Sequence, residues 1–284
     1  MERTSEFVMA TRAFAKNRTA VIGVILVALV ILSITIGPLA IRYDPMDQDV
    51  MNRYSRPALW SGHLLGTDGF GRDVLARVIY GSRIALVMAV SVIVVSLSIG
   101  TFVGIVSALK GGVLDYIITE IVNILMAFPT LLVALILLSI VGPGFTNLIG
   151  TLVFVFSYRF VRLSRGVALS IAKKNYIEAA KAIGANDLRI ALHHILPNLL
   201  GDLVAIGSLW IGATILASAG LSFLGIGIQP PTPSLGNMVR TGISNLTMAP
   251  WASISPGLAI LIIVLAFNMV GDGFRDALDP RLRS

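Results

Sequence analysis

The chain has 284 residues, of which 56% are hydrophobic and only 13% charged; soluble domains carry about 25% charged residues, so this composition excludes a soluble globular domain and indicates an integral membrane protein. The 22 Lys and Arg residues outnumber the 15 Asp and Glu residues, but they lie between apolar stretches and not along one solvated face, which argues against a nucleic-acid-binding protein. Because the chain has no cysteine, it can form no disulfide, thiolate nucleophile or cysteine-ligated metal site.

The first predicted span follows a short, mildly basic tail at residues 1–19. Residues 20–41 carry no charge, and a helix of this length covers about 30 Å, enough to cross a membrane. A cleavable signal peptide is the alternative, but its apolar region would be only about 7 to 15 residues long. We therefore predict a retained span with the tail on the cytosolic side.

Residues 42–83 are expected to form a loop on the outer side of the membrane. Glycines around Asp68 predict a tight turn. The segment after the turn carries an apolar stripe that predicts a helix lying on the outer interface, made of Val74, Leu75, Val78 and Ile79. His63 and Asp68 invite a metal or catalytic interpretation, but no third ligand or base lies at useful spacing, so a structural loop is preferred.

Residues 84–271 contain five further predicted spans. The second span, 84–109, carries small residues four apart that predict close helix packing, namely Ser96, Gly100, Gly104 and Ala108. The third begins near the acidic residues Asp115 and Glu120, and Gly142-Pro143-Gly144 separates it from the fourth. The fourth span is expected to end near three arginines that can reach the cytosolic headgroups, namely Arg159, Arg162 and Arg165.

The fifth span is expected at residues 199–223 and the sixth at 252–271. Between them, residues 225–250 are predicted to be an outer loop, because the proline-rich run 229–233 cannot continue a helix. Residues 272–284 form a polar tail on the cytosolic side. The predicted fold is thus an all-α membrane protein with six transmembrane helices and both termini inside.

The charge distribution supports this orientation by the positive-inside rule. The predicted inner side carries Arg3, Arg12, Lys16, Arg18, Lys110, Arg159, Arg162, Arg165, Lys173, Lys174, Lys181, Arg189, Arg275, Arg281 and Arg283. The predicted outer side carries Arg42, Arg53, Arg56, Arg72, Arg77, Arg83 and Arg240. Arg72, Arg77 and Arg83 run against the rule, which we explain by a first loop that its own fold holds at the interface.

A polar segment at residues 170–197 interrupts the apolar core and predicts a cytosolic helix–turn–helix. Asn175 can cap its first helix, with Glu178 at the third position completing a capping box, and Gly184 closes that helix. Asn186 or Asp187 can cap the second helix, and Pro197 ends it or kinks its junction with the next span.

The second helix of this segment shows an apolar periodicity. Its predicted apolar face consists of Leu188, Ala191, Leu192 and Ile195, with Arg189 and His193 on the opposite side. His193 and His194 could suggest a metal pair, but adjacent helix positions point about 100° apart. A polar face or a headgroup contact is therefore the better interpretation.

The spacing of Glu178-Ala179-Ala180, Gly184 and Leu196-Pro197 resembles the EAA loop of permease subunits in binding-protein-dependent ABC importers. That family usually carries isoleucine ten residues after the glycine, where this chain has His194 with Ile195 beside it. Taken alone, Glu178 could also be only a capping-box residue. The runs GHLLGTDGFGRDVLARVIYGSRIAL, LSFLGIGIQPPTPSLGNM and GDGFRDALDPRLR are similar to the DppC/OppC type, so the resemblance covers about residues 12–283.

The resemblance implies a type I (MetI-like) importer permease in the cell (inner) membrane, with di- or oligopeptides as substrate and nickel or another small solute as the alternative. It implies a second homologous permease, two ATP-binding subunits and an extracytoplasmic solute-binding protein as partners. No cofactor is expected in this chain, since ATP and Mg would be bound by the partner subunits. The coupling helix seated in the ATPase would be formed by Glu178, Ala179, Ala180, Gly184, Leu196 and Pro197.

Two observations from the residues bear on the energy source. No Gly-Lys dipeptide occurs in the chain, so it has no Walker A phosphate loop and is not expected to be an enzyme. The predicted span centres carry no ionisable residue, which argues against a secondary transporter driven by protons or ions, the runner-up function. An intramembrane enzyme is a third class, but His63, His193 and His194 all lie outside the predicted spans.

Overall fold

A computed structural model describes residues 14–58 and 62–278. In these ranges the protein is helical apart from loops, and only an isolated bridge joins Thr67 to Asp73. The helices are α2 (Arg18–Ala40), α3 (Val74–Lys110), α4 (Gly112–Ala127), α5 (Thr130–Val141), α6 (Phe145–Ala172), α7 (Asn175–Ala182), α8 (Asp187–Ile190), α9 (Leu196–Phe223), α10 (Leu235–Ile243) and α11 (Trp251–Leu278), with a 3₁₀ turn at Val50–Asn52 and a π-helical turn at Ala191–Ile195.

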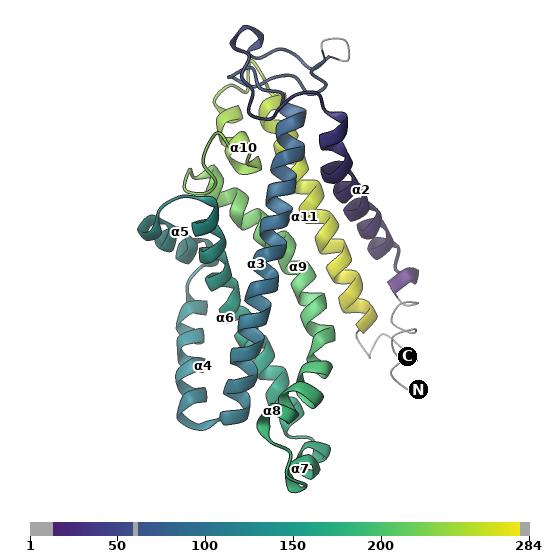
Figure 1. Ribbon diagram of the computed structural model, residues 1–284, viewed down its shortest axis with the longest axis vertical. Helices are drawn as coiled ribbons and strands as arrows, with labels where there is room; N and C mark the ends of the chain where they lie inside the picture. Colours follow the sequence, from purple (N-terminus) through teal and green to yellow (C-terminus); the bar gives the residue numbers. More distant parts are fainter. Residues whose placement is uncertain (1–13, 59–61, 279–284) are drawn as a thin grey trace.

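The long helices α3, α6 and α9 run side by side through the molecule (Figure 1). On one flank lie α11 and α2, while α4 and α5 lie on the other. The loop after α2 and the helix α10 cover one end of the bundle, and α7 and α8 form the opposite end. These two ends are called the outer cap (residues 42–73 and 225–250) and the coupling segment (residues 173–197).

The main core lies between α3, α6 and α9. Its largest fully buried side chains include Phe160, Leu148 and Leu152 of α6 and Leu199 and Leu203 of α9. Apolar side chains also cover the outside of the bundle, as expected for helices that face lipid. Fold and apolar surface together agree with a multi-pass membrane protein.

Close packing of α3 on α6 depends on the predicted stripe of small residues. A Cβ atom on Gly104 would lie 2.6 Å from the Val161 backbone oxygen, and one on Gly100 would lie 2.6 Å from the Ser157 oxygen. The Ser96 hydroxyl donates a hydrogen bond of 3.1 Å to the Val153 oxygen. The small-residue prediction is confirmed, and the partner helix is α6.

Four helical segments among the described residues are long and apolar enough to cross a membrane, and α4 with α5 makes a fifth if this bent pair is one span. The segments are Arg18–Ala40, Val74–Lys110, Asp187–Phe223 and Trp251–Ala277. α6 has 28 residues, but its three arginines lower its hydropathy. The arrangement of six spans therefore stays a prediction.

The predicted separate helix on the outer interface is wrong, because Val74 begins α3 itself. The Asp73 side chain caps α3 by accepting a 2.7 Å hydrogen bond from the Ala76 N–H. No helix-breaking residue follows before Lys110, so the helix continues for 37 residues, or about 55 Å. Its first turn is buried against Met238, Ala249 and Ala252 instead of lying on lipid.

The third span is also not a continuous helix. α4 and α5 meet at an angle of 96°. Pro129 lacks an N–H group and disfavours helical geometry at the preceding residue, and Phe128 is accordingly extended, with φ −96° and ψ 144°. Pro129 is a helix-breaking signal in the sequence, but the sequence analysis passed over it because the residues on both sides carry no charge.

α6 continues past Arg159 to Ala172, so the helix extends beyond the residues near which the fourth span was expected to end. Where the span itself ends stays a prediction. Arg159 is the fifteenth of its 28 residues, so an ionisable residue lies at the middle of a bundle helix. Arg165 forms an ion pair with Asp115 at 2.5 Å, where we expected a headgroup contact. The Arg162 side chain is exposed.

Two further boundaries differ from the prediction. The outer loop 225–250 contains the helix α10, whose buried residues Leu235 and Met238 attach it to the bundle. Gly236 permits this close approach, because a Cβ atom there would overlap the Ala219 backbone. α11 continues past residue 271 to Leu278, so most of the predicted polar tail is helical; residues 279–284, like 1–13, lie outside the described range.

Candidate functional site: the coupling segment and the outer cap

The coupling segment projects at the end of the bundle opposite the outer cap (Figure 1). In α7, Ile177 is fully buried and Ala180 is 8% exposed, so both attach the helix to the body of the protein. Glu178 and Ala179 are exposed. Of the three residues in the EAA triplet, two therefore lie on the outward face and one on the inward face.

The predicted capping box at the start of α7 is wrong. Lys174 occupies the N-cap position in extended conformation, and no side chain caps the helix. Asn175 is the first helical residue, so Glu178 is the fourth and not the third residue after the N-cap, one position later than a capping box requires. The Glu178 carboxylate forms no ion pair with any residue in the ranges that the structure describes.

Gly184 closes α7 as predicted, with φ +89°. The Ala185 N–H bonds to the Ala180 oxygen at 3.0 Å and the Gly184 N–H bonds to the Lys181 oxygen at 2.9 Å. This pair of hydrogen bonds is the Schellman ending, which requires a left-handed residue where Gly184 lies. No atom outside its chain neighbours comes within 4 Å of a Cβ built there, so backbone conformation alone favours glycine.

Asn186, one of the two caps considered for α8, occupies the N-cap position. Its side chain accepts a hydrogen bond of 2.9 Å from the Arg189 N–H. Pro197 does not end the helix that begins at Asp187, which continues into α9. A π-helical turn precedes it, in which the Leu196 N–H bonds to the Ala191 oxygen, and Pro197 takes the second position of α9. The helix α8, the π-helical turn and α9 thus form one continuous helical rod from Asp187 to Phe223.

The predicted apolar face of this rod is confirmed at Ile195, but Leu188 and Leu192 are not buried. Ile190 and Ile195 are fully buried, whereas Leu188 is 66% exposed and Leu192 is 51% exposed. The π-helical turn widens the spacing between inward positions from four residues to five, which a regular helical period does not anticipate. Leu188 and Leu192 instead line an apolar groove of about 740 Å³ against Leu109 and other residues of α3.

An ion pair connects the coupling segment to the bundle. Lys110, the last residue of α3, lies 3.6 Å from Asp187, the first residue of α8. Both side chains are about half exposed, so the ion pair contributes little stability. It does show that the end of α3 and the start of α8 are neighbours. The sequence analysis missed this contact, because the two residues are far apart in the chain.

In the outer cap, His63 and Asp73 take the structural role that the sequence analysis preferred for His63. The His63 Nδ1 lies 2.8 Å from the Asp73 carboxylate, and the Tyr43 ring stacks on the imidazole at 4.4 Å. Trp251 of α11 donates a hydrogen bond of 3.1 Å to the Thr67 oxygen. The loop is thereby attached to the ends of both α3 and α11.

Two arginines that contradict the positive-inside rule are structural. Asp68 lies 2.7 Å from Arg72 and 3.8 Å from Arg77, and Arg77 donates a 2.6 Å hydrogen bond to the Pro45 oxygen. Arg77 is 2% exposed. The two guanidinium groups therefore share the carboxylate of Asp68 within the fold of the outer cap.

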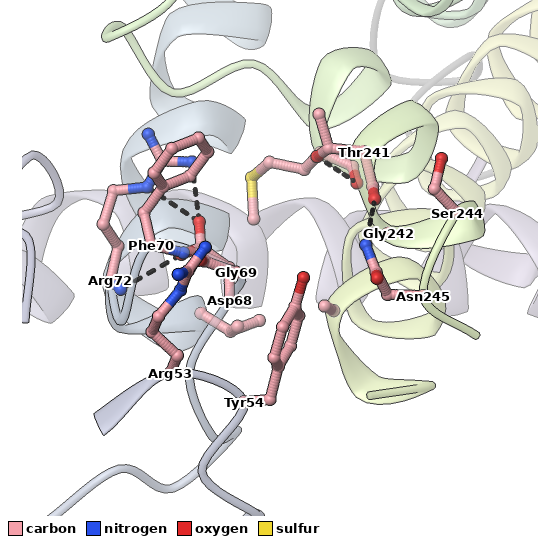
Figure 2. A pocket seen from close by; sticks show the side chains of 13 residues that line it. Arg53, Tyr54, Asp68, Gly69, Phe70, Arg72, Thr241, Gly242, Ser244 and Asn245 are labelled. Atoms are coloured by element: carbon pink, nitrogen blue, oxygen red, sulfur yellow. Dashed lines mark hydrogen bonds and ion pairs between the residues drawn. The ribbon is translucent and has the colours of Figure 1, made fainter. Parts of the chain in front are cut away.

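A cavity of about 320 Å³ opens between the loop and α10 (Figure 2). Arg53, Phe70 and Arg72 line one wall and Thr241 and Asn245 the other. The Arg53 Nε donates to the Gly69 oxygen at 2.5 Å, and the Arg72 guanidinium lies 4.6 Å from the centre of the Phe70 ring. The sequence analysis missed this cavity because its two walls come from segments about 170 residues apart in the chain.

A second outer cavity of about 580 Å³ adjoins the first, with Phe70, Arg72, Met238 and Thr241 lining both. Arg240 also lines it. In the described part of the chain, no group of three or more His, Cys, Asp or Glu side chains is placed to hold a metal ion. Three arginines, Arg53, Arg72 and Arg240, therefore line a polar, basic recess at this end of the bundle.

Comparison with known proteins identifies the family. Residues 100–284 match the binding-protein-dependent transport system inner membrane component, and residues 5–57 match the N-terminal TM domain of oligopeptide transport permease C. The chain is 39% identical to a dipeptide transport system permease protein of Haemophilus influenzae, covering 95% of this chain and 93% of that protein.

Other relatives are similar over comparable lengths. A glutathione transport system permease protein of Pectobacterium atrosepticum is 38% identical, over 96% of this chain and 90% of its own length. A di/tripeptide transport system permease protein of Pseudomonas aeruginosa is 35% identical, over 96% and 91%. The resemblance drawn from the sequence motifs is confirmed, and the chain belongs to the family of binding-protein-dependent transport system inner membrane components.

Proposed function

We propose that this chain is a membrane subunit of an ABC importer that moves di- or oligopeptides across the cell (inner) membrane. Similarity over nearly the whole chain to permeases named for dipeptides and for di/tripeptides carries this proposal. The glutathione permease is consistent with it, since glutathione is itself a small peptide. ATP and Mg are bound in partner subunits, which hydrolyse the ATP, and this chain forms part of the path through the membrane.

The arrangement of the bundle supports six spans, with the bent pair α4 and α5 counted as the third and α6 as the fourth. Both termini lie on the cytosolic side with the coupling segment. The outer cap faces the extracytoplasmic solute-binding protein, and a second homologous permease completes the path. The basic recess of the outer cap suits contact with a partner surface carrying carboxylates.

The importer would contain two ATP-binding subunits, one for each permease. The coupling segment of this chain is where one of them would drive the motion of the bundle helices. The outward Glu178 and Ala179 lie where a groove of the ATPase would receive α7, while Ala180 anchors the helix and Gly184 sets its angle to α8. Leu196 and Pro197 begin α9, so displacement of α7 and α8 moves a bundle helix directly. The continuous rod from Asp187 to Phe223 supports this transmission.

Reconstitution tests the proposal. The chain is co-expressed with its second permease and ATP-binding subunits, purified, and placed in vesicles with the binding protein. Uptake of a radiolabelled dipeptide that requires ATP and is abolished by a non-hydrolysable analogue is expected. Uptake driven by a proton gradient without ATP would instead identify a secondary transporter.

A further inference from the structure

Arg159 lies at the middle of α6 and its side chain is partly buried. It is next to Phe160 and near Ser157, the two residues of α6 that Gly100 of α3 contacts most closely. α3 carries no charge between Arg83 and Lys110, and Gly100 lies ten residues before Lys110. At 1.5 Å per residue, Arg159 is about 15 Å from the cytosolic end of this uncharged stretch, near the centre of a hydrocarbon layer about 30 Å thick.

The contacts of Arg159 leave its charge uncompensated. Its Nη2 donates to the Thr130 hydroxyl, and its guanidinium carbon lies 5.9 Å from the centre of the Trp210 ring. Its Nε is buried and donates no hydrogen bond within the described residues, and none of the ion pairs found there includes Arg159. Ionisable groups at this depth are costly and normally pair with an opposite charge or serve a transported solute.

The surroundings of Arg159 favour an anion. Thr130 is the first residue of α5, and no side chain caps that helix, so the positive end of its dipole lies beside the guanidinium. The Trp210 ring is held by Phe160, whose ring centre is 4.6 Å away. An aromatic neighbour of this kind stabilises the cation without using its N–H donors, which remain suited to two parallel hydrogen bonds with a carboxylate.

We propose that Arg159 binds the terminal carboxylate of the peptide as it crosses the membrane. This inference rests on the proposed function, because every unmodified linear di- or oligopeptide carries such a carboxylate. A lipid phosphate is the other anion of similar chemistry, but headgroups lie at the membrane surface and not at this depth. The contact is with one chemical group shared by all substrates, so it assists passage without selecting among side chains.

Uptake by reconstituted vesicles tests the contact with two probes, the dipeptide Ala-Phe and its C-terminal amide. Each probe is supplied at saturating concentration with the same binding protein. The rate ratio of free acid to amide is measured for the wild type and for Arg159→Gln. Preferences of the binding protein enter both ratios equally and cancel when one ratio is divided by the other.

We expect Arg159→Gln to lower the acid-to-amide ratio about tenfold, the effect of losing a charge-assisted pair of hydrogen bonds. Arg162→Gln is the matched control, because Arg162 is exposed one turn nearer the cytosol, where its Nη1 lies 3.4 Å from the Met126 sulfur. It is expected to keep the wild-type ratio. A lipid contact would change both rates equally and leave the ratio unaltered.

An unchanged ratio in Arg159→Gln overturns the inference while leaving peptide transport intact. Wild-type vesicles that take up neither probe overturn the proposed substrate class, and this inference with it. If Arg159→Gln fails to assemble by size-exclusion chromatography, Arg159→Lys decides. A single ammonium cannot form the two parallel bonds, so a ratio lowered about threefold is expected, and a wild-type ratio contradicts the contact.

Discussion

Asn17 and Asp276 are 259 positions apart in the sequence, yet the Asn17 side-chain amide donates a hydrogen bond of 3.0 Å to the Asp276 carboxylate. The Phe14 and Phe274 rings lie beside this contact, with centres 4.9 Å apart. The beginning of α2 and the end of α11 are therefore neighbours. If both helices cross the membrane once, the two ends of the described chain lie on the same side of it.

The first prediction fixes that side. Single cysteines at Thr247 in the outer cap and Ala182 in the coupling segment replace exposed residues, and the natural chain has no cysteine to interfere. A membrane-impermeant maleimide applied to intact cells should label Thr247→Cys, and should label Ala182→Cys only after the membrane is opened. Labelling of Ala182→Cys in intact cells would reverse the proposed orientation.

The second prediction concerns the contact between α3 and α6. Gly104→Ala places a Cβ atom 2.6 Å from the Val161 oxygen, so the helices must separate, at a cost of about 1–3 kcal/mol in the free energy of unfolding. Gly150→Ala is the control, because that glycine of α6 has no atom within 4 Å of a Cβ. It should be neutral or stabilising by up to about 1 kcal/mol. Thermal unfolding in detergent measures both, and equal midpoints would refute close packing at Gly104.

Local signals in the sequence were reliable where the backbone alone decides. Gly184 was assigned its turn correctly, Asn186 was one of the two caps considered for α8, and the small residues of α3 were recognised as a packing surface. Leu188 and Ile195 were predicted on one face, but a π-helical turn at Ala191–Ile195 changes the spacing between them, and Ile195 is buried while Leu188 is exposed.

Contacts between distant residues could not be predicted in the same way. Lys110 lies against Asp187 only because the bundle brings the end of α3 and the start of α8 together. The sequence analysis placed Arg159 near a span end because it is the first charged residue after the uncharged run that follows Glu120. In the folded bundle it lies at the middle of α6, beside Thr130 and Trp210.

The third prediction separates a contact role of Glu178 from a structural one. With no capping box, neither Glu178→Gln nor Glu178→Lys should change the free energy of unfolding by more than about 0.5 kcal/mol. If a cationic ATPase residue pairs with Glu178, the Lys variant should weaken ATPase binding about tenfold and the Gln variant less. Titration of the permease pair with purified ATPase measures this, and identical affinities in all three proteins would exclude the pairing.

The last prediction concerns the angle between α7 and α8, which Gly184 sets. Gly184→Val forces a β-branched residue to adopt φ +89°, at a local cost of about 1–2 kcal/mol, with no steric clash to add to it. Since only the turn is affected, membrane insertion and assembly of the bundle should be normal. The Schellman hydrogen bonds that hold α7 should weaken, and peptide-stimulated ATP hydrolysis should fall to the basal rate.

Gly184→Asn is the matched control for this variant, because asparagine tolerates the left-handed region far better than valine. It should retain at least about half of the stimulated hydrolysis, given a smaller conformational cost at the same site. Both variants are compared in vesicles with the binding protein and peptide present. If Val and Asn lower stimulation equally, added bulk at the ATPase surface and not the backbone angle is the cause; if neither lowers it, the turn at Gly184 takes no part in coupling.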